Sequence, residues 1–305
     1  MNKVINRNTF LKKLSIISAA SIINPIECIS DNLDNDITIM HTNDFHSHID
    51  PFPLNHNKYA GLGGISKRSS IINLIRKNNK NTLLLDAGDI IQGTPYFNYF
   101  GGNLEFKLMN LLKYDCITLG NHDFDNGLIK LKELIKLAKF DTVISNYKFN
   151  DLNIEDEILK YKIFYKGKFK IGVFGLGIKL DGLVNKNLYG NTKYINPLEC
   201  AHTTSKFLKF NEKCNLIICL SHLGYSYNSN RISDIKLAKN NNYIDLIIGG
   251  HTHTLLDRPT LVKDVNNNKK YIFQAGWGGL YLGKIDIKLT REGLEFLNKF
   301  SIINI

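Results

Sequence analysis

The sequence has few cysteines, no long apolar run and no cluster of like charges, and each absence excludes a class of protein. Its five cysteines are an odd number and form no Cys-x-x-Cys pair, so they predict neither a disulfide framework nor a zinc knuckle. No run reaches the roughly 18 apolar residues that a membrane-spanning helix needs, so no transmembrane segment is expected. No internal shift of composition marks a boundary, and the 305 residues predict one large α/β domain.

The formal net charge of +11 raises the question of a nucleic-acid partner. The lysines do not cluster, however: those between Lys130 and Lys139 alternate with leucines and isoleucines, a pattern typical of the solvated face of a helix. A nucleic-acid partner is therefore not expected. A positive field still attracts small phosphate esters.

Residues 1–35 have the outline of an export signal rather than of a folded segment. Basic residues up to Lys13 precede the uncharged run from Leu14 to Asn24. Arg7-Asn8 resembles a twin-arginine signal in which Asn8 replaces the second arginine. The sequence thus predicts an exported, periplasmic protein with its domain at 36–305; the alternative is an N-terminal arm on a cytoplasmic protein.

The rest of the chain alternates strands and helices before ending in strands. Strands are expected at 37–40, 82–85, 116–119, 142–144, 216–220 and 246–248, and helices at 65–75, 104–112, 128–138, 197–210 and 232–238. This alternation predicts right-handed crossovers and largely parallel pairing. A hairpin at 163–174 and an all-β ending at 261–289 add antiparallel strands. The expected fold is a four-layer αββα sandwich of two mixed sheets.

Five of these apolar runs end in side chains that bind metal ions. Open α/β sheets place their ligands beyond the carboxyl ends of the strands, so we expect the five ends to converge on one site. Oxygen and imidazole donors in this number exceed the needs of one tetrahedral zinc and suit two ions that share a carboxylate. The seven candidate ligands are Asp44, His46, Asp89, Asn121, His222, His251 and His253.

These residues stand in motifs that resemble a known superfamily. Asp44-x-His46, Gly88-Asp89, Gly120-Asn121-His122-Asp123, His222 and Gly250-His251-x-His253 resemble the calcineurin-like metallophosphoesterases. The longer motifs at 87–95 and 120–127 resemble the bacterial 5′-nucleotidase and UDP-sugar hydrolase family. The resemblance covers about residues 37–290.

The resemblance implies a role for each residue of the site. Asp44, His46, Asp89 and His253 would hold one divalent ion, and Asp89, Asn121, His222 and His251 the other; Zn, Mn, Fe or Co would suit these donors. His122 would contact the phosphoryl or leaving oxygen and Asp125 would orient His122. The alternative for His122 is a hydrogen-bonding residue behind the ligands. At Asp123 the resemblance asks only for an acidic residue and assigns it no metal.

The expected function is that of a dinuclear metal-dependent phosphatase that hydrolyses phosphate monoesters, and nucleotides are the substrates expected before all others. The alternatives are a phosphodiesterase or nuclease of the same superfamily, and a non-catalytic metal-binding subunit. The resembled nucleotidases carry a C-terminal nucleotide-binding domain, which is expected to be absent here. Either a separate subunit with that domain is the partner that supplies the specificity pocket, or the substrate is a simpler phosphate ester. The sequence leaves two alternatives for each of two further residues. His48 lies either behind the ligands or in an exposed loop, and Arg68 lies either at an exposed helix position or against the substrate.

Overall fold

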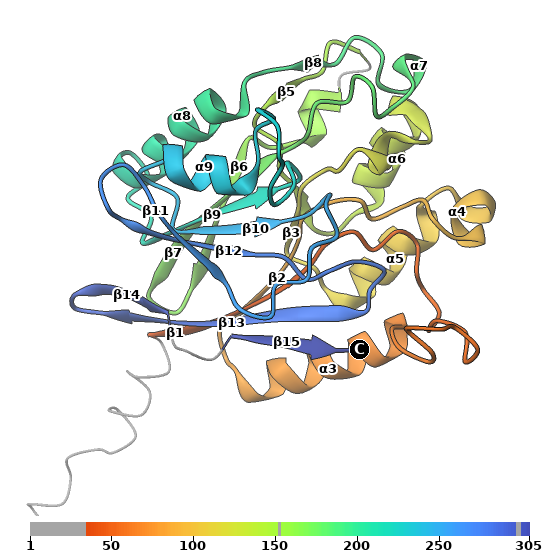
Figure 1. Cartoon of the computed structure of the whole chain (residues 1–305), viewed down its shortest axis with the longest axis horizontal. Coiled ribbons are helices and arrows are strands. Elements are labelled where there is room, and N and C mark those ends of the chain that lie inside the picture. Colours follow the sequence, from red (N-terminus) through yellow and green to blue (C-terminus); the bar gives the residue numbers. More distant parts are fainter. Residues whose placement is uncertain (1–34, 152–153, 297–299) are drawn as a thin grey trace, which may run out of the picture.

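The structure is a computed structural model that describes residues 35–151, 154–296 and 300–305 (Figure 1). Nearly all of the expected export segment, residues 1–34, lies outside the described residues. Within the described ranges, every helix is too short or too polar to cross a membrane.

The first sheet contains the N-terminal strands and the end of the chain. Strands β1 (Asp36–Thr42), β2 (Thr82–Asp86), β3 (Cys116–Ile117) and β4 (Asp141–Thr142) are parallel to one another. On the other side of β1, β13 (Tyr281–Thr290) runs antiparallel and pairs with both β14 (Gly293–Phe296) and β15 (Ser301–Asn304). The sheet is therefore mixed, as predicted.

The second sheet has the order β11-β12-β10-β9-β7-β6. Its four central strands, β12 (Lys269–Phe273), β10 (Leu246–Gly249), β9 (Leu216–Ser221) and β7 (Phe169–Leu176), are parallel. The edge strands β11 (Thr260–Lys263) and β6 (Tyr161–Lys166) are antiparallel to their neighbours. A separate two-stranded sheet joins β5 (Tyr147–Lys148) to β8 (Lys193–Tyr194).

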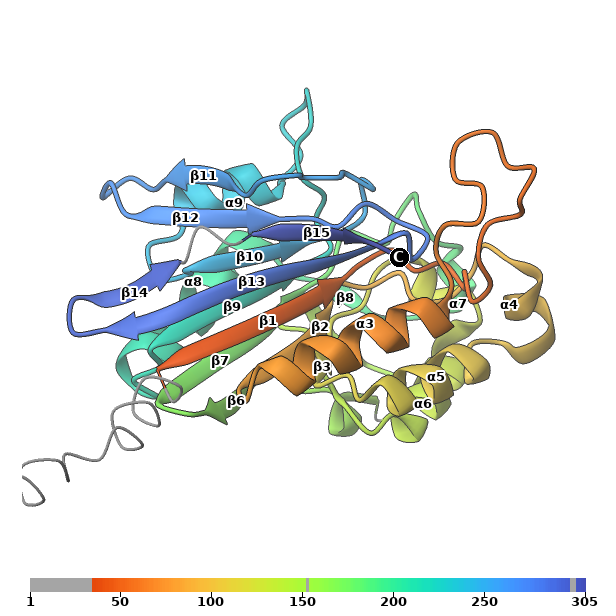
Figure 2. The same ribbon diagram turned by 90° about the horizontal axis from the view of Figure 1, so that it is seen from below.

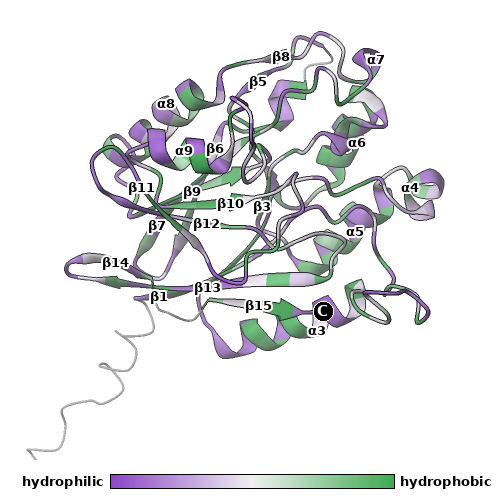
Figure 3. Cartoon of the chain, in the orientation of Figure 1, coloured by the Kyte–Doolittle hydropathy of each residue, from purple (hydrophilic) through white to green (hydrophobic). Residues whose placement is uncertain are grey.

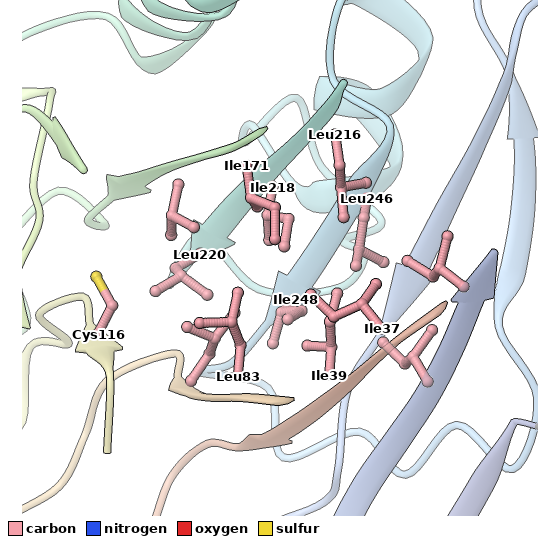
Figure 4. Packing of buried hydrophobic residues seen from close by; sticks show 14 of the residues in the cluster. Ile37, Ile39, Leu83, Cys116, Ile171, Leu216, Ile218, Leu220, Leu246 and Ile248 are labelled. Carbon is pink, nitrogen blue, oxygen red and sulfur yellow. The ribbon is translucent and has the colours of Figure 1, made fainter. Parts of the chain in front are cut away.

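The two sheets pack face to face around an apolar core. Ile39 and Leu83 from the first sheet meet Ile218 and Ile248 from the second, all with no exposed surface (Figure 4). Strands that are covered on both faces consist of nearly continuous apolar residues, which explains why β2, β9 and β10 could be predicted from the sequence.

Helices cover the two outer faces (Figures 1 and 2). Apolar side chains of α3 (Ile65–Asn78), α5 (Asn103–Leu112) and α6 (Gly127–Leu137) pack on the first sheet. Those of α8 (Pro197–Phe210) and α9 (Asp234–Asn240) pack on the second. The order of layers is helix, sheet, sheet, helix, which confirms the predicted four-layer sandwich, and the helices keep hydrophilic residues on their outer sides (Figure 3).

The differences from the sequence-based expectation are local. Strands β3 and β4 are shorter than predicted, and the polar turn after β3 contains a 3-10 helix, η1 (His122–Phe124). Helix α4 (Pro95–Phe100) was not predicted, and it begins at Pro95, which is suited to a first helical turn. The described residues also include two short helices, η2 (Ile154–Glu157) and α7 (Lys186–Tyr189).

Candidate metal centre

The carboxyl ends of the central strands of both sheets meet at one edge of the molecule. The loops after β1, β2 and β3 come from the first sheet, and those after β9 and β10 come from the second. Parallel neighbours necessarily end on the same side of a sheet, so their loops share that edge. The structure brings all seven predicted ligands into this region, in two groups that are linked by short contacts between side chains.

The backbone at this edge is unusual. Five of the seven predicted ligands have positive φ angles: Asp44 (51°), His46 (51°), Asp89 (57°), His251 (72°) and His253 (52°). Residues other than glycine rarely adopt this conformation, and it clusters at functional sites, where the surrounding structure holds it in place. Here hydrogen bonds between the loops do so, with Asp44 N–H donating to Gly88 O and His46 N–H to Asp89 O.

The first group consists of Asp44, His46 and His253, whose donor atoms lie within 4.8 Å of one another. The Nε2 atoms of the two histidines are 3.1 Å apart, and His253 Nε2 is 3.4 Å from Asp44 Oδ1. His46 Nε2 also lies 3.8 Å from Asp89 Oδ2. Asp89 is therefore within reach of this group as well as of the second.

The second group consists of Asp89, His222 and His251, again within 4.8 Å. His222 Nε2 lies 3.0 Å from Asp89 Oδ2, and Asn121 Oδ1 lies 2.9 Å from His251 Nδ1. Burial lowers the pKa of His222, yet the neighbouring Asp89 carboxylate more than offsets this and raises it to about 10. The two groups contain six of the seven predicted ligands, with Asp89 in the second group only, and the seventh, Asn121, contacts His251.

The chemistry of these atoms fits cations. His222 Nδ1 donates to Ala87 O, so Nε2 faces the Asp89 carboxylate, and the raised pKa of His222 places a proton between these two atoms when no metal is bound. A cation that displaced this proton would take up the Nε2 lone pair. His46 Nδ1 likewise lies 3.1 Å from Gln92 O, so that its Nε2 presents a lone pair to His253. Lone pairs that face each other in a buried site repel unless a cation or proton lies between them. The donor sets therefore suit two divalent ions.

A histidine and a carboxylate stand beside the two groups. His122 Nδ1 is 2.7 Å from Asp125 Oδ2, and the His122 ring centroid is 5.2 Å from that of His46. The hydrogen bond from His122 to Asp125 raises the pKa of His122. The His122 side chain is 35 % exposed, in contrast to the buried His222. It can therefore reach a molecule that enters from solvent.

The structure also shows contacts of two buried residues to which the sequence assigned no role. Asp123 is buried, and its carboxylate accepts hydrogen bonds from the backbone N–H groups of Gly120, Asp89 and Ile90. Asn43 is buried too: its side chain donates to Asp44 Oδ2 and Gly276 O and accepts from Ala275 N–H. Asp123 thus fixes the Asp89 turn, and Asn43 ties Asp44 to the loop after β12.

Aromatic contacts extend the centre outward. Trp277 stacks on His253 with ring centroids 5.5 Å apart and planes within 5° of parallel. His48 is half-buried, stacks on Phe52 and touches Trp277 edge-on, so it is neither exposed nor directly behind a ligand. The expectation of an exposed helix position for Arg68 was wrong: it is 1 % exposed, with its guanidinium 4.3 Å above the Phe45 ring, because the start of α3 packs on the loop after β1.

A two-sheet sandwich that carries two groups of cation donors at its strand ends is an architecture of dinuclear metallohydrolases. Residues 37–255 match the model of the calcineurin-like phosphoesterases, and the chain belongs to this family. Its members use two divalent metal ions.

Individual relatives carry nucleotide-related names. The chain is 32% identical over 278 residues to the snake venom 5′-nucleotidase of Crotalus adamanteus, covering 85% of this chain and 46% of that protein. It is 30% identical over 299 residues to the trifunctional nucleotide phosphoesterase YfkN of Bacillus subtilis, covering 88% and 19%. The solved 5′-nucleotidase precursor of Thermus thermophilus superposes with a TM-score of 0.80 at 30% identity, over 88% of this chain and 54% of that one. The chain thus spans about half the length, or less, of these relatives.

Proposed function

We propose that this chain is a dinuclear metal-dependent phosphatase that hydrolyses phosphate monoesters, with nucleotides as its main substrates. The observation that carries the proposal is the pairing of two cation-donor groups with an exposed histidine that is hydrogen-bonded to Asp125. The relatives named as 5′-nucleotidases and nucleotide phosphoesterases support the substrate class.

In the proposed centre, Asp44, His46 and His253 would hold one ion, Asn121, His222 and His251 would hold the other, and Asp89 would contribute to both. Bound ions would supply positive charge and activate water. Ala87 O and Gln92 O, which accept from His222 and His46, fix the tautomers that leave Nε2 free for a metal. Asp89 also accepts from His122 N–H through Oδ1, which places His122 next to both groups.

His122 is proposed as the catalytic group that contacts the substrate. Asp125 holds its Nδ1 proton, so Nε2 is directed away from Asp125. Because its pKa is raised, the protonated ring is favoured and can donate from Nε2 to a phosphoryl or leaving oxygen as negative charge develops there. Asp125 acts through His122 and is a positioning residue.

The test is phosphate release from AMP and from p-nitrophenyl phosphate by the purified full chain with Mn²⁺ or Zn²⁺, together with metal analysis of the same sample. Turnover of both esters is expected. His122→Asn should lower kcat by about 10²-fold or more while the metal content stays unchanged. Absence of turnover in a sample with two bound ions would refute the proposal. An unchanged kcat in His122→Asn would show that His122 has only a structural role.

The same assay separates the alternatives. A phosphodiesterase or nuclease would cleave bis-p-nitrophenyl phosphate or single-stranded DNA in preference to AMP. A non-catalytic subunit would bind two ions and hydrolyse none of these substrates. A requirement for a separate polypeptide that supplies a C-terminal nucleotide-binding domain would appear as a strong dependence of AMP turnover on that polypeptide.

Export is proposed as part of this function. Its support is the basic stretch before Leu14 together with relatives named as a venom protein and as a precursor. N-terminal sequencing of the protein from its native cell fraction would decide, since cleavage near residue 35 is expected only on export.

A further inference from the structure

A cavity of about 710 Å³ lies next to the metal centre, between the segment that follows His46 and helix α4. Its lining begins with Ser47 and His48, which follow His46 directly in the chain. Small-molecule sites are typically concave and of roughly 300–1,000 Å³. The cavity is therefore large enough for an organic group.

Two sets of contacts connect the cavity to ligands of the first group. Gln92 O lies 3.1 Å from His46 Nδ1, and two residues later Thr94 Oγ1 donates to Ser47 O at 2.8 Å, so one short segment borders both the ligand and the cavity. On the other side, the Phe52 ring in the cavity wall lies 5.8 Å from the Trp277 ring, which stacks on His253. An ester that binds through its phosphoryl group at the centre thus has a cavity beside it for its leaving group.

The walls are aromatic and partly open to solvent. Phe52 and Pro53 form one wall, and Tyr96, Tyr99 and Phe100 form the other. Tyr99 is 83% exposed and Phe100 is 46% exposed, while the Tyr96 and Phe100 rings lie 6.3 Å apart and 22° from parallel. Exposed aromatic rings around a hollow are surfaces on which flat bases stack, whichever base is present.

The polar groups of the cavity select against a second phosphate. Asp50 Oδ2 accepts a hydrogen bond from Tyr96 O–H at 2.6 Å, and among the described residues that line the cavity there is no lysine or arginine. A carboxylate repels an anion but accepts hydrogen bonds from hydroxyl groups. A flat, uncharged occupant with vicinal hydroxyls matches this wall, and a nucleoside has these properties.

We infer that this cavity binds the nucleoside part of a nucleoside monophosphate, with the base between the aromatic walls and the ribose hydroxyls at Asp50. The inference rests on the proposed function, because it places the leaving group of the same reaction. It makes Tyr99 and Asp50 specificity-determining residues that take no part in bond cleavage.

Adenosine binding to the metal-free full chain tests the site without any reaction. Trp277 is the single tryptophan of the chain and lies next to the cavity wall, so its fluorescence reports the titration. Tyr99→Ala should weaken adenosine binding about tenfold, the effect of losing one stacking ring. The matched control is Tyr165→Ala, which removes a 70% exposed tyrosine from β6 and should leave binding unchanged. Asp50→Ala should weaken binding of adenosine but not of 2′,3′-dideoxyadenosine.

Kinetics supply the second readout. Tyr99→Ala should raise KM for AMP about tenfold, leave kcat unchanged and leave both constants unchanged for methyl phosphate, which has no base. Equal adenosine affinity of the wild type and Tyr99→Ala would overturn the inference, as would equal kinetic changes for both esters. A change in oligomeric state in Tyr99→Ala, with unchanged adenosine binding, would also overturn it and assign the aromatic walls to contact with a second copy. Failure of the wild type to hydrolyse any ester would refute the proposed function, while the titration would still decide whether a nucleoside binds.

Discussion

Replacing Asp123 by alanine removes the acceptor that holds the turn after β2 against the turn after β3. Oδ2 accepts from Gly120 N–H at 2.8 Å and Asp89 N–H at 3.0 Å, and Oδ1 accepts from Ile90 N–H at 2.9 Å. Each buried donor that loses its acceptor costs about 1–3 kcal/mol of unfolding free energy. Because the surrounding turns can partly relax, we expect the three donors together to cost roughly 3–5 kcal/mol. This is a large share of the roughly 5–15 kcal/mol that stabilises a typical domain.

The assay is urea denaturation of metal-free protein, followed by metal titration of the folded fraction. Asp123→Asn gives an intermediate loss of about 1–2 kcal/mol, because an amide oxygen can replace one side of the carboxylate but its NH₂ faces a backbone donor on the other. Asp181→Ala is the control, since that carboxylate is 71% exposed and its removal should change stability by less than about 0.5 kcal/mol. If Asp123→Ala denatured at the same urea concentration as the control, the structural role assigned to Asp123 would be wrong.

Two further predictions concern metal and pH. Because the donors come from both sheets, divalent ions should stabilise the folded chain by about 2.7 kcal/mol at a hundredfold excess over Kd, and chelation should lower Tm by about 4–5 °C in a thermal scan; an unchanged Tm would contradict a site shared by the two sheets. His41 on β1 has no exposed surface and burial lowers its pKa to about 3, so below pH 6.5 the unfolded chain takes up a proton that the folded chain does not. The free energy of unfolding should therefore decrease as pH falls. In His41→Leu, this decrease between pH 7 and pH 5 should be smaller by about 2 kcal/mol, as measured by denaturation curves. The same pH dependence in the two proteins would show that His41 does not contribute.

The convergence of the proposed ligands on one edge was predictable from the sequence because each lies at the end of an apolar run. His222 and His251 follow strands that are covered on both faces, and such strands produce an unbroken apolar signal. The family motifs then assigned roles that spacing alone left open. The sandwich itself followed from the alternation of strands and helices and from the change to strands near the C-terminus.

The residues that surround the ligands were not predictable, because their contacts join segments far apart in the sequence. Asn43 bonds to Ala275 across 232 positions, and no local pattern encodes such a pair. Arg68 occupies a helical position at which a charged residue normally faces solvent, but the loop after β1 covers it. Helix α4 was missed because six residues are too few to show helical periodicity, and with it the aromatic wall of the cavity was missed.

The left-handed backbone at five of the proposed ligands also has an evolutionary consequence. Each such residue costs about 1–2 kcal/mol relative to a relaxed conformation, whereas glycine adopts the same angles freely. If a descendant of this chain no longer needed metal, glycine at His253, whose side chain is 40% exposed, would stabilise it and would accumulate by drift, whereas the buried Asp44 and Asp89 carboxylates would still be needed as hydrogen-bond acceptors. The chain instead carries aspartate and histidine at all five positions. A non-catalytic descendant would be expected to show glycine at the position of His253 first.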